Sequence, residues 1–332
     1  MIIRLWKSLL LLAVTLSVGS GLTSAVWASD KESEGLMLIH RALQLTDLNK
    51  SGPYHIRASL TVVDEAVGKR EGTDVVNFSS TERWRRDLHM TGYDEVAVFL
   101  GHSMYRTRSL GFTPPSLRKD IAGSLRNLPE TLSYKVIRVF NRKIRDVEAR
   151  CVYQEQKNDQ PVEVTWCFDP HTGLPLAQLS GNGHARIEFS SYKPFGDRFV
   201  PGTIEVIVDR KQKGKAVIEA IDSDISDSAH IFEPPVGATA RQWCDNMEGP
   251  RPISVPGPDI PRVARLGTGL ELTYELEVDA QGKVTSVIPM AASPYADRFA
   301  IETMRAWQLK PAMCDHTPVP TDIVIYLGSM RH

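Results

Sequence analysis

The feature that most constrains this chain is a long succession of segments in which apolar and polar residues alternate. Within residues 55–63, for example, Ile56, Ala58 and Leu60 alternate with polar residues. A period of two residues is typical of a strand with one buried face and one solvated face. The same pattern predicts further strands near residues 72–79, 82–90, 94–100, 104–107, 134–140, 144–155, 162–168, 184–190, 202–209 and 215–221. So many strands joined by short turns predict one large, strongly curved antiparallel sheet.

Few helices are predicted to accompany this sheet. Within the N-terminal 238 residues, apolar residues have helical spacing over 33–48 and over 116–128, where the helix follows Pro114 and Pro115. A sheet has to cover its apolar face, and two modest helices cover little. Two interpretations therefore stay open: the curved sheet encloses an apolar hollow, or its side chains fill an ordinary core.

The first 28 residues have the composition of an export signal. A basic start with Arg4 and Lys7 precedes an apolar run, and Val26-Trp27-Ala28 has the small residues of a cleavage site. This predicts a secretory signal peptide over 1–28 and a periplasmic location. The alternative is an uncleaved anchor in the inner membrane, because the apolar stretch is nearly long enough to span a bilayer. Only that alternative implies contact with a membrane.

Four cysteines in an exported chain predict two disulfides. Cys151 and Cys167 are each eight residues from Asp159, which lies in the polar turn at 157–160, so a hairpin places their sulfurs opposite each other. The second bond then joins Cys244 to Cys314. A metal site is the competing interpretation, but no Cys-x-x-Cys or histidine-rich spacing supports it.

The C-terminal quarter has a different pattern, in the order strand, strand, helix, strand. Apolar residues of one parity predict a strand over 270–278, with Glu275 and Glu277 on the opposite, polar side. A turn at 279–282 leads to a strand over 283–288, and a helix begins at Ser293-Pro294 and ends before Pro311. Thr321 to Leu327 forms the last strand.

These residues resemble the C-terminal domain of TonB-type proteins. The resemblance covers about 259–328 and is carried by Asp279-Ala280-Gln281-Gly282-Lys283-Val284, by Trp307-Gln308-Leu309-Lys310-Pro311-Ala312 and by Pro318-Val319-Pro320. Leu309 stands where the family usually has Phe. The resemblance implies a non-catalytic periplasmic domain that contacts a partner protein or peptidoglycan. It also implies that the last strand pairs with a strand of the partner. The candidate residues for that pairing are Thr321, Asp322, Ile323, Val324, Ile325, Tyr326 and Leu327.

Residues 30–238 are similar to the half-barrel domains of the lipoprotein carrier LolA and its relatives. The similarity is carried by the turn and strand segments 168–176, 192–195, 199–206 and 231–238. It implies a fold whose concave face binds acyl chains. These motifs consist of general turn chemistry, so no ligand-contacting residue is assigned from them.

The predicted domain organisation is a signal peptide (1–28), a LolA-like sheet domain (29–238), a proline-rich linker (239–262) and a TonB-like domain (263–332). The proline-rich segment 249–261 is expected to be stiff and extended. It would reach only about 40 Å at roughly 3.1 Å per residue, which is too short to bridge a cell envelope. The role of an energy transducer therefore requires the uncleaved anchor, with the sheet domain as spacer.

The sequence contains no motif for catalysis, a cofactor or a metal ion. Its formal net charge of −1 and its mixed charges indicate no nucleic-acid partner. Arg83, Arg85 and Arg86 are expected on a solvated strand face. We therefore predict an α+β, non-enzymatic envelope protein whose C-terminal domain docks on a protein or on the cell wall. The alternative is a carrier that holds a lipid or another apolar ligand in the curved sheet.

Overall fold

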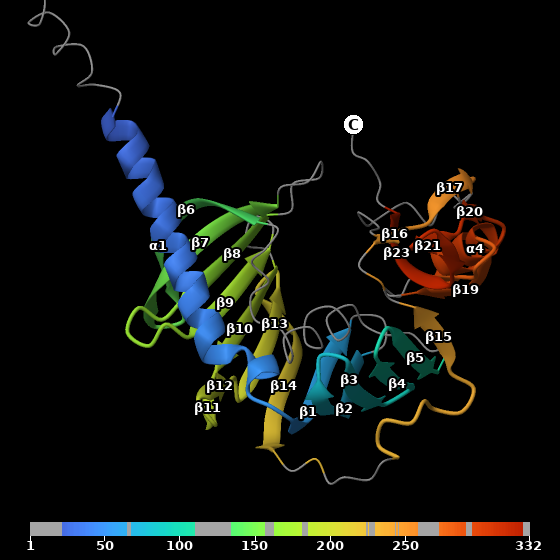
Figure 1. Cartoon of the computed structure of the whole chain (residues 1–332), viewed down its shortest axis with the longest axis horizontal. Coiled ribbons are helices and arrows are strands. Elements are labelled where there is room, and N and C mark those ends of the chain that lie inside the picture. Colours follow the sequence, from blue (N-terminus) through green and yellow to red (C-terminus); the bar gives the residue numbers. More distant parts are fainter. Residues whose placement is uncertain are drawn as a thin grey trace, which may run out of the picture. The chain divides into compact units, whose positions relative to one another are not determined.

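The computed structural model describes residues 22–64, 68–109, 134–156, 163–180, 185–223, 225, 230–242, 244, 246–257, 272–289 and 294–327 (Figure 1). The chain forms two compact units, each built from two stretches of sequence. Unit 1 combines Met1–Gln44 with Pro129–Gly181, and unit 2 combines Leu45–Leu128 with Asn182–His332. The predicted signal sequence up to residue 21, the second predicted helix (116–128) and the predicted turn at 157–160 lie outside the described residues. Among the described residues, no helix has the length and apolarity that crossing a membrane requires.

Unit 1 consists of a helix and an antiparallel sheet with the strand order β9-β8-β7-β6. Its elements are α1 (Leu22–Thr46, which ends just inside unit 2), β6 (Tyr134–Ile144), β7 (Val147–Gln156), β8 (Glu163–Phe168) and β9 (Pro175–Ser180). Helix α1 buries Ile39 and Ala42 and begins earlier than the predicted start at residue 33. A β-carbon at Gly35 would lie 2.7 Å from Val136 of β6, so the absence of a side chain there lets the helix approach the sheet closely.

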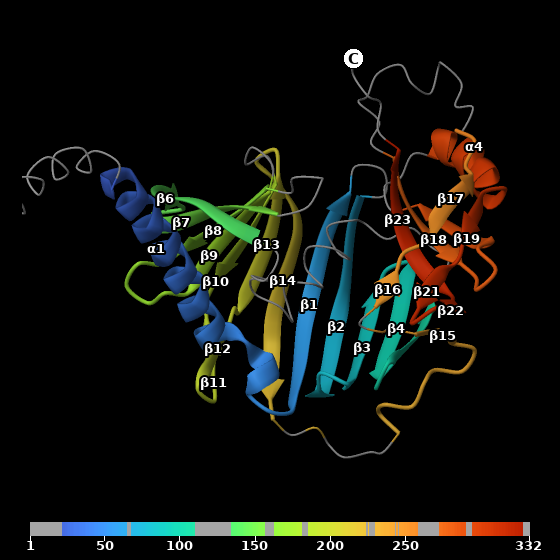
Figure 2. The same cartoon turned by 45° about the horizontal axis from the view of Figure 1, so that its top comes forward.

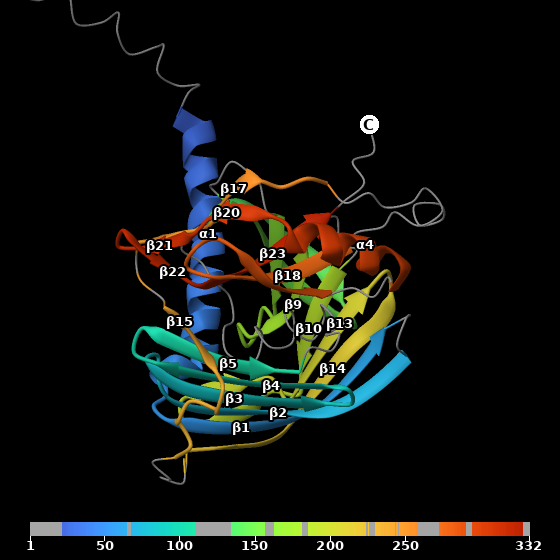
Figure 3. The same cartoon turned by 90° about the vertical axis from the view of Figure 1, so that its right-hand side faces the viewer.

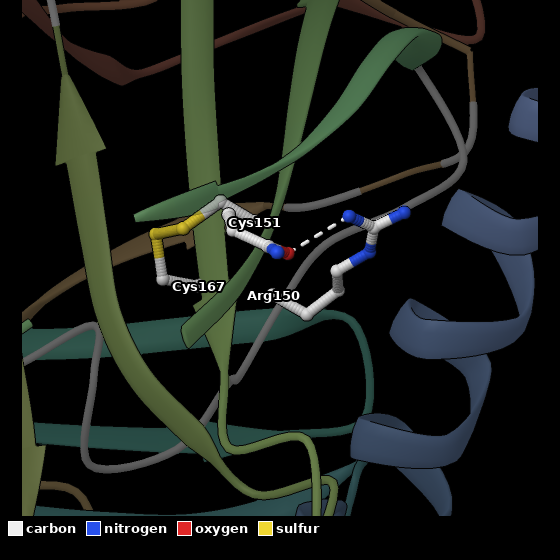
Figure 4. The surroundings of a disulfide bond; sticks show 4 residues. Arg150, Cys151 and Cys167 are labelled. Carbon is white, nitrogen blue, oxygen red and sulfur yellow. Dashed lines mark hydrogen bonds between the residues drawn. A yellow bond between two sulfur atoms is a disulfide. The ribbon is translucent and has the colours of Figure 1, made fainter. Parts of the chain in front are cut away.

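A polar contact and a disulfide fix unit 1 further. Arg150 on β7 forms a 2.6 Å ion pair with Glu34 of α1. It also donates a 2.8 Å hydrogen bond to Asn141, which is the dashed line in Figure 4. Cys151 and Cys167 lie directly opposite each other on β7 and β8 and form the predicted disulfide. Both cysteines are completely buried, in a small apolar cluster with residues of β6 and β9.

Unit 2 contains an antiparallel sheet with the strand order β15-β5-β4-β3-β2-β1-β14-β13-β10 (Figure 2). The short helical turn η1 (Leu48–Lys50) precedes this sheet. Its strands are β1 (Tyr54–Asp64), β2 (Gly68–Ser80), β3 (Arg83–Met90), β4 (Tyr93–Leu100), β5 (Ser103–Arg108), β10 (Ala185–Ser190), β13 (Thr203–Val208), β14 (Lys211–Asp222) and β15 (Thr239–Gln242). A separate hairpin joins β11 (Lys193–Phe195) and β12 (Arg198–Val200). Strands β1, β2 and β14 bend along their length (Figure 3). The predicted strands are present, and the fold is mostly antiparallel sheet, as predicted.

The rest of unit 2 is a small α+β structure that we call the C-terminal module. It comprises β16 (Met247–Glu248), β17 (Arg251–Ser254), β18 (Leu272–Val278), β19 (Val284–Pro289), α4 (Pro294–Arg305), β20 (Gln308–Lys310), β21 (Ala312–Cys314), β22 (Thr317–Val319) and β23 (Thr321–Leu327). The sheet order is β19-β18-β23. Tyr274 and Leu276 of β18 pack against Ala300, Met304 and Trp307 in its core.

The predicted turn between β18 and β19 has the geometry that its residues favour. The Asp279 carboxylate accepts 2.9 Å hydrogen bonds from the backbone of Gln281 and Lys283, which is the local bonding that favours aspartate in turns. Gly282 has φ +81°, and a β-carbon there would collide with the carbonyl oxygen of Leu309. Only glycine fits this position without strain.

The proline-rich linker is only partly a spacer. Arg251–Ser254 forms β17 and pairs with β20, and Met247–Glu248 forms β16 and pairs with β21. The disulfide between Cys244 and Cys314 ties the start of the linker to the module, as predicted. These residues are therefore extended but not a free spacer, because backbone pairing with β20 and β21 satisfies groups that a free spacer leaves to water.

Candidate functional site

Strand register defines an apolar row across one face of the sheet in unit 2. Residues directly opposite each other on neighbouring antiparallel strands project from the same face. The residues that follow one another in this way, from β1 to β5, are Tyr54, Phe78, Trp84, Phe99 and Met104. We call them the aromatic row. Tyr54 stacks on Phe78 with ring centroids 4.7 Å apart, and Trp84 stacks on Phe99 at 5.7 Å.

Burial changes along the aromatic row. Tyr54 and Phe78 are buried, whereas Trp84, Phe99 and Met104 are only half-buried. The row therefore begins in the core and ends, on β3 to β5, in apolar side chains that retain exposed surface. Such surface is where an apolar ligand finds contact area.

The same face carries a buried charged group beside the aromatic row. Arg86 of β3 donates hydrogen bonds of 2.8–3.1 Å to both carboxylate oxygens of Asp74 on β2. Tyr93 donates a 2.6 Å hydrogen bond to Glu95 on β4. Burial disfavours the charged guanidinium, but the negative charge and hydrogen bonds of Asp74, together with the nearby charge of Glu95, outweigh it and raise the pKa of Arg86. Arg86 therefore keeps its charge in the buried part of this face.

Strands β5 and β15 place three arginines on this face, which we call the arginine cluster: Arg106, Arg108 and Arg241. Register puts Arg106 opposite Ala97 of β4 and puts Arg241 opposite Met104 at the end of the aromatic row. Across the sheet, the side chains on this face thus change from apolar on β1 to positively charged on β5 and β15.

Carboxylates of the C-terminal module meet the arginine cluster. Arg106 lies 2.6 Å from Glu275 and 2.7 Å from Asp322. Arg108 lies 2.8 Å from Glu275 and 2.8 Å from Glu277. Arg241 lies 3.1 Å from Asp322. Three positive and three negative side chains thus form one ion cluster, and its centre is desolvated, because the side chains of Arg108 and Glu275 are each only 4% exposed.

Sequence reasoning missed this cluster. Glu275 was expected on the solvated side of its strand but is buried, and Arg86, expected on a solvated face, is buried against Asp74. The available signal was complementary spacing: two arginines two residues apart on one strand match two glutamates two residues apart on another. This spacing predicts ion pairs only if the two strands are known to meet. The sequence does not show that they meet, because Arg106 and Glu275 are 169 residues apart in the chain.

The predicted partner-binding strand, Thr321–Leu327, forms β23 at the edge of the module's sheet. It pairs with β18 in antiparallel register. Ile323 and Ile325 pack on the module core, Asp322 faces the arginine cluster, and Val324 is 42% exposed. Pairing of this strand with a partner stays a prediction.

All four predicted disulfide cysteines are brought together in their predicted pairs. In the described part of the chain, Cys244, Cys314 and Asp315 are the one group whose ligand atoms lie close enough to hold a metal ion. Two of its three ligands are the sulfurs of a disulfide, which lack the thiolate form that coordinates metals.

No protein-family model and no curated protein matches the chain. It is similar to a solved DUF1329 family protein from Desulfovibrio piger, at 12% identity and TM-score 0.43, over 61% of this chain and 97% of that one. A LolA superfamily protein from Nitrosomonas europaea gives 12% identity and TM-score 0.42, over 60% and 97% of the two chains. The MucA/MucB complex of Pseudomonas aeruginosa gives 9% identity and TM-score 0.28, over 84% and 99%.

These TM-scores are all below 0.5, and such likenesses carry no inference about function. The solved structures similar to this chain include a LolA superfamily protein. The comparisons give no support to the resemblance of residues 259–328 to TonB-type domains.

Proposed function

We propose that this protein is a non-enzymatic protein of the cell envelope that binds an apolar ligand, such as an acyl chain, against the aromatic row. The observation that carries the proposal is the row itself, in which stacked aromatic rings lead from the core to half-buried Trp84, Phe99 and Met104. The predicted export signal supports the location in the envelope.

The chemistry of the exposed end suits a flexible apolar chain. Aromatic rings offer large, rigid apolar surfaces, and methionine adapts its shape to irregular ligands. The covalent disulfide in unit 1 and the disulfide-tied module in unit 2 suit an oxidising compartment. An acyl chain laid along the row would cover the surface that Trp84 and Phe99 leave exposed.

Native mass spectrometry of protein purified from its own cell envelope is the first test. A bound lipid adds a discrete mass to the folded protein, and that mass disappears after denaturation. Repeated absence of added mass in mild detergent-free preparations would count heavily against the proposal.

A pair of variants on one strand locates the ligand. Phe99→Ala removes a half-buried ring from the row, and losing about 1–2 kcal/mol of apolar contact weakens binding about five- to thirtyfold. Val96→Ala is the matched control, because Val96 is half-buried on the same strand but projects from the opposite face. Equal effects of the two substitutions on displacement of an apolar fluorescent probe would place the ligand elsewhere.

A second candidate function is docking on an envelope protein or on peptidoglycan through the C-terminal module. The edge position of β23 and the exposed Val324 favour it, because an edge strand offers backbone groups for pairing. Val324→Pro removes a backbone donor there, and Val324→Ala keeps it. Unchanged capture of partners by the proline variant, with the module still folded, would exclude strand pairing.

A further inference from the structure

The arginine cluster adjoins the exposed end of the aromatic row. Arg241 lies directly opposite Met104, the last residue of the row, and Arg106 is two residues further along β5 on the same face. An apolar chain that lies on the half-buried part of the row, from β3 to β5, therefore ends near Arg241 and Arg106 of the arginine cluster. That order of apolar and then cationic surface matches a ligand with an apolar tail and an anionic head.

The carboxylates of the C-terminal module bind the arginine cluster in the way that the anionic group of a ligand would bind it. Glu275 and Asp322 bring carboxylate oxygens to 2.6 and 2.7 Å from the same nitrogen of Arg106. Guanidinium groups bind carboxylate and phosphate oxygens by the same charge-assisted hydrogen bonds. The three arginines belong to β5 and β15, so they converge on this face independently of the strands that carry the carboxylates.

The carboxylates leave part of the cluster's donor capacity unused. Nε and Nη1 of Arg108 and Nη1 of Arg241 are buried and have no hydrogen-bond acceptor among the residues that the structure describes. Arg108 Nη1 lies 2.8 Å from a Glu275 oxygen, but without the geometry of a hydrogen bond. A buried donor without an acceptor is costly, and a phosphate group offers more acceptor oxygens at one point than a carboxylate does.

Other charged side chains on the same face affect the electrostatic potential at the arginine cluster. Glu95 of β4 lies opposite Arg108 and accepts the Tyr93 hydrogen bond. Arg86 and Asp74, further along the face, neutralise each other. Counting the described residues of this face, the three arginines would face one buried glutamate without the module's carboxylates, which leaves a net positive site.

We propose that the arginine cluster binds the anionic group of an amphiphile whose apolar part lies along the aromatic row, and that Glu275 and Asp322 occupy this site when the ligand is absent. The proposal rests on the apolar-ligand function proposed above. Binding of the anionic group competes with the ion pairs that seat the C-terminal module, so ligand binding and release of the module are linked.

The test compares decyl phosphate, decanol and inorganic phosphate by titration calorimetry on the full chain, with both amphiphiles below the concentrations at which they aggregate. We expect decyl phosphate to bind at least tenfold more tightly than decanol. Arg106→Gln should abolish this preference. Arg57→Gln should keep it, because Arg57 also pairs with a glutamate (3.1 Å from Glu219) but is exposed on the opposite face of β1.

If the module's carboxylates compete with the ligand for the arginine cluster, removing a carboxylate should raise the affinity for the anionic ligand. An arginine cluster with only a structural role would not give this result. Glu275→Gln should raise the affinity for decyl phosphate severalfold and leave that for decanol unchanged. Glu277→Gln, at a more exposed carboxylate, should act in the same direction with a smaller effect, and it keeps the test available if Glu275→Gln fails to fold.

The other outcomes separate this proposal from the function on which it rests. Equal binding of decanol and decyl phosphate overturns the anionic site but leaves an apolar-ligand protein. Binding of neither amphiphile overturns both. Inorganic phosphate that binds as tightly as decyl phosphate shows a site for a free anion and overturns the amphiphile.

Discussion

Replacing Glu275 with glutamine removes one charge from the centre of the desolvated ion cluster. Glu275 contacts both Arg106 and Arg108, and the side chains of Glu275 and Arg108 are almost fully buried. Breaking a buried ion pair by removing one partner costs about 3–5 kcal/mol, because it leaves an uncompensated buried charge. Arg106 keeps Asp322 and Arg108 keeps Glu277, so we expect the lower end, about 3 kcal/mol.

Urea unfolding, followed by far-UV circular dichroism, measures this loss. With a slope of about 3 kcal/mol per molar of urea, the midpoint should fall by about 1 M. Glu277→Gln is the matched control, because its side chain is 26% exposed, and an ion pair this accessible to water contributes about 1 kcal/mol or less. A double variant, Glu275→Leu with Arg108→Met, should recover much of the loss, because an apolar pair of similar volume avoids the desolvation of two charges.

Two results would refute this reasoning about the junction. Equal midpoint shifts for Glu275→Gln and Glu277→Gln would mean that burial does not set the cost of breaking these ion pairs. A neutral Glu275→Gln would mean that the carboxylate does not compensate the arginines in solution.

Three further predictions concern other parts of the chain. Replacing Cys151 and Cys167 with alanine opens a loop of 16 residues, and should lower the free energy of unfolding by about 3 kcal/mol in a urea titration without reductant; an unchanged midpoint would contradict the chain-entropy argument. Gly282→Ala should destabilise the module by about 1–3 kcal/mol, and more than Gly52→Ala, which has a similar φ of +87° but open space around it; thermal melts of the two variants decide this. Burial, and after it hydrogen bonds to two glutamates, raises the pKa of Tyr153 to about 12 from an ordinary value of 10.0. The stabilising contribution of the protonated Tyr153 is therefore complete below pH 10 and is lost as pH rises towards 12. The urea midpoint of Tyr153→Phe should fall less over that range than the midpoint of the unchanged protein, and identical falls would contradict the raised pKa.

The sequence determined the local structure of this protein. Alternation of apolar and polar residues predicted the strands, because a strand with one buried face leaves a two-residue period. Asp279 and Gly282 predicted the turn between them. The Asp279 side chain accepts hydrogen bonds from backbone groups of the turn, and Gly282 supplies the positive φ that the turn needs. The positions of Cys151 and Cys167 predicted their disulfide, because the two strands of a hairpin are close in the chain.

Only the tertiary structure decided which polar side chains are buried. The polar side of the strand at 272–278 was expected in water, but it meets arginines from β5 and β15 and becomes part of a desolvated cluster. A residue's sequence neighbours fix which face of its strand it occupies, and they do not fix what covers that face. The same holds for Arg86, because only the register between β2 and β3 brings it within hydrogen-bonding distance of Asp74. It also holds for Arg251–Ser254, a proline-rich segment that becomes a strand by pairing with β20.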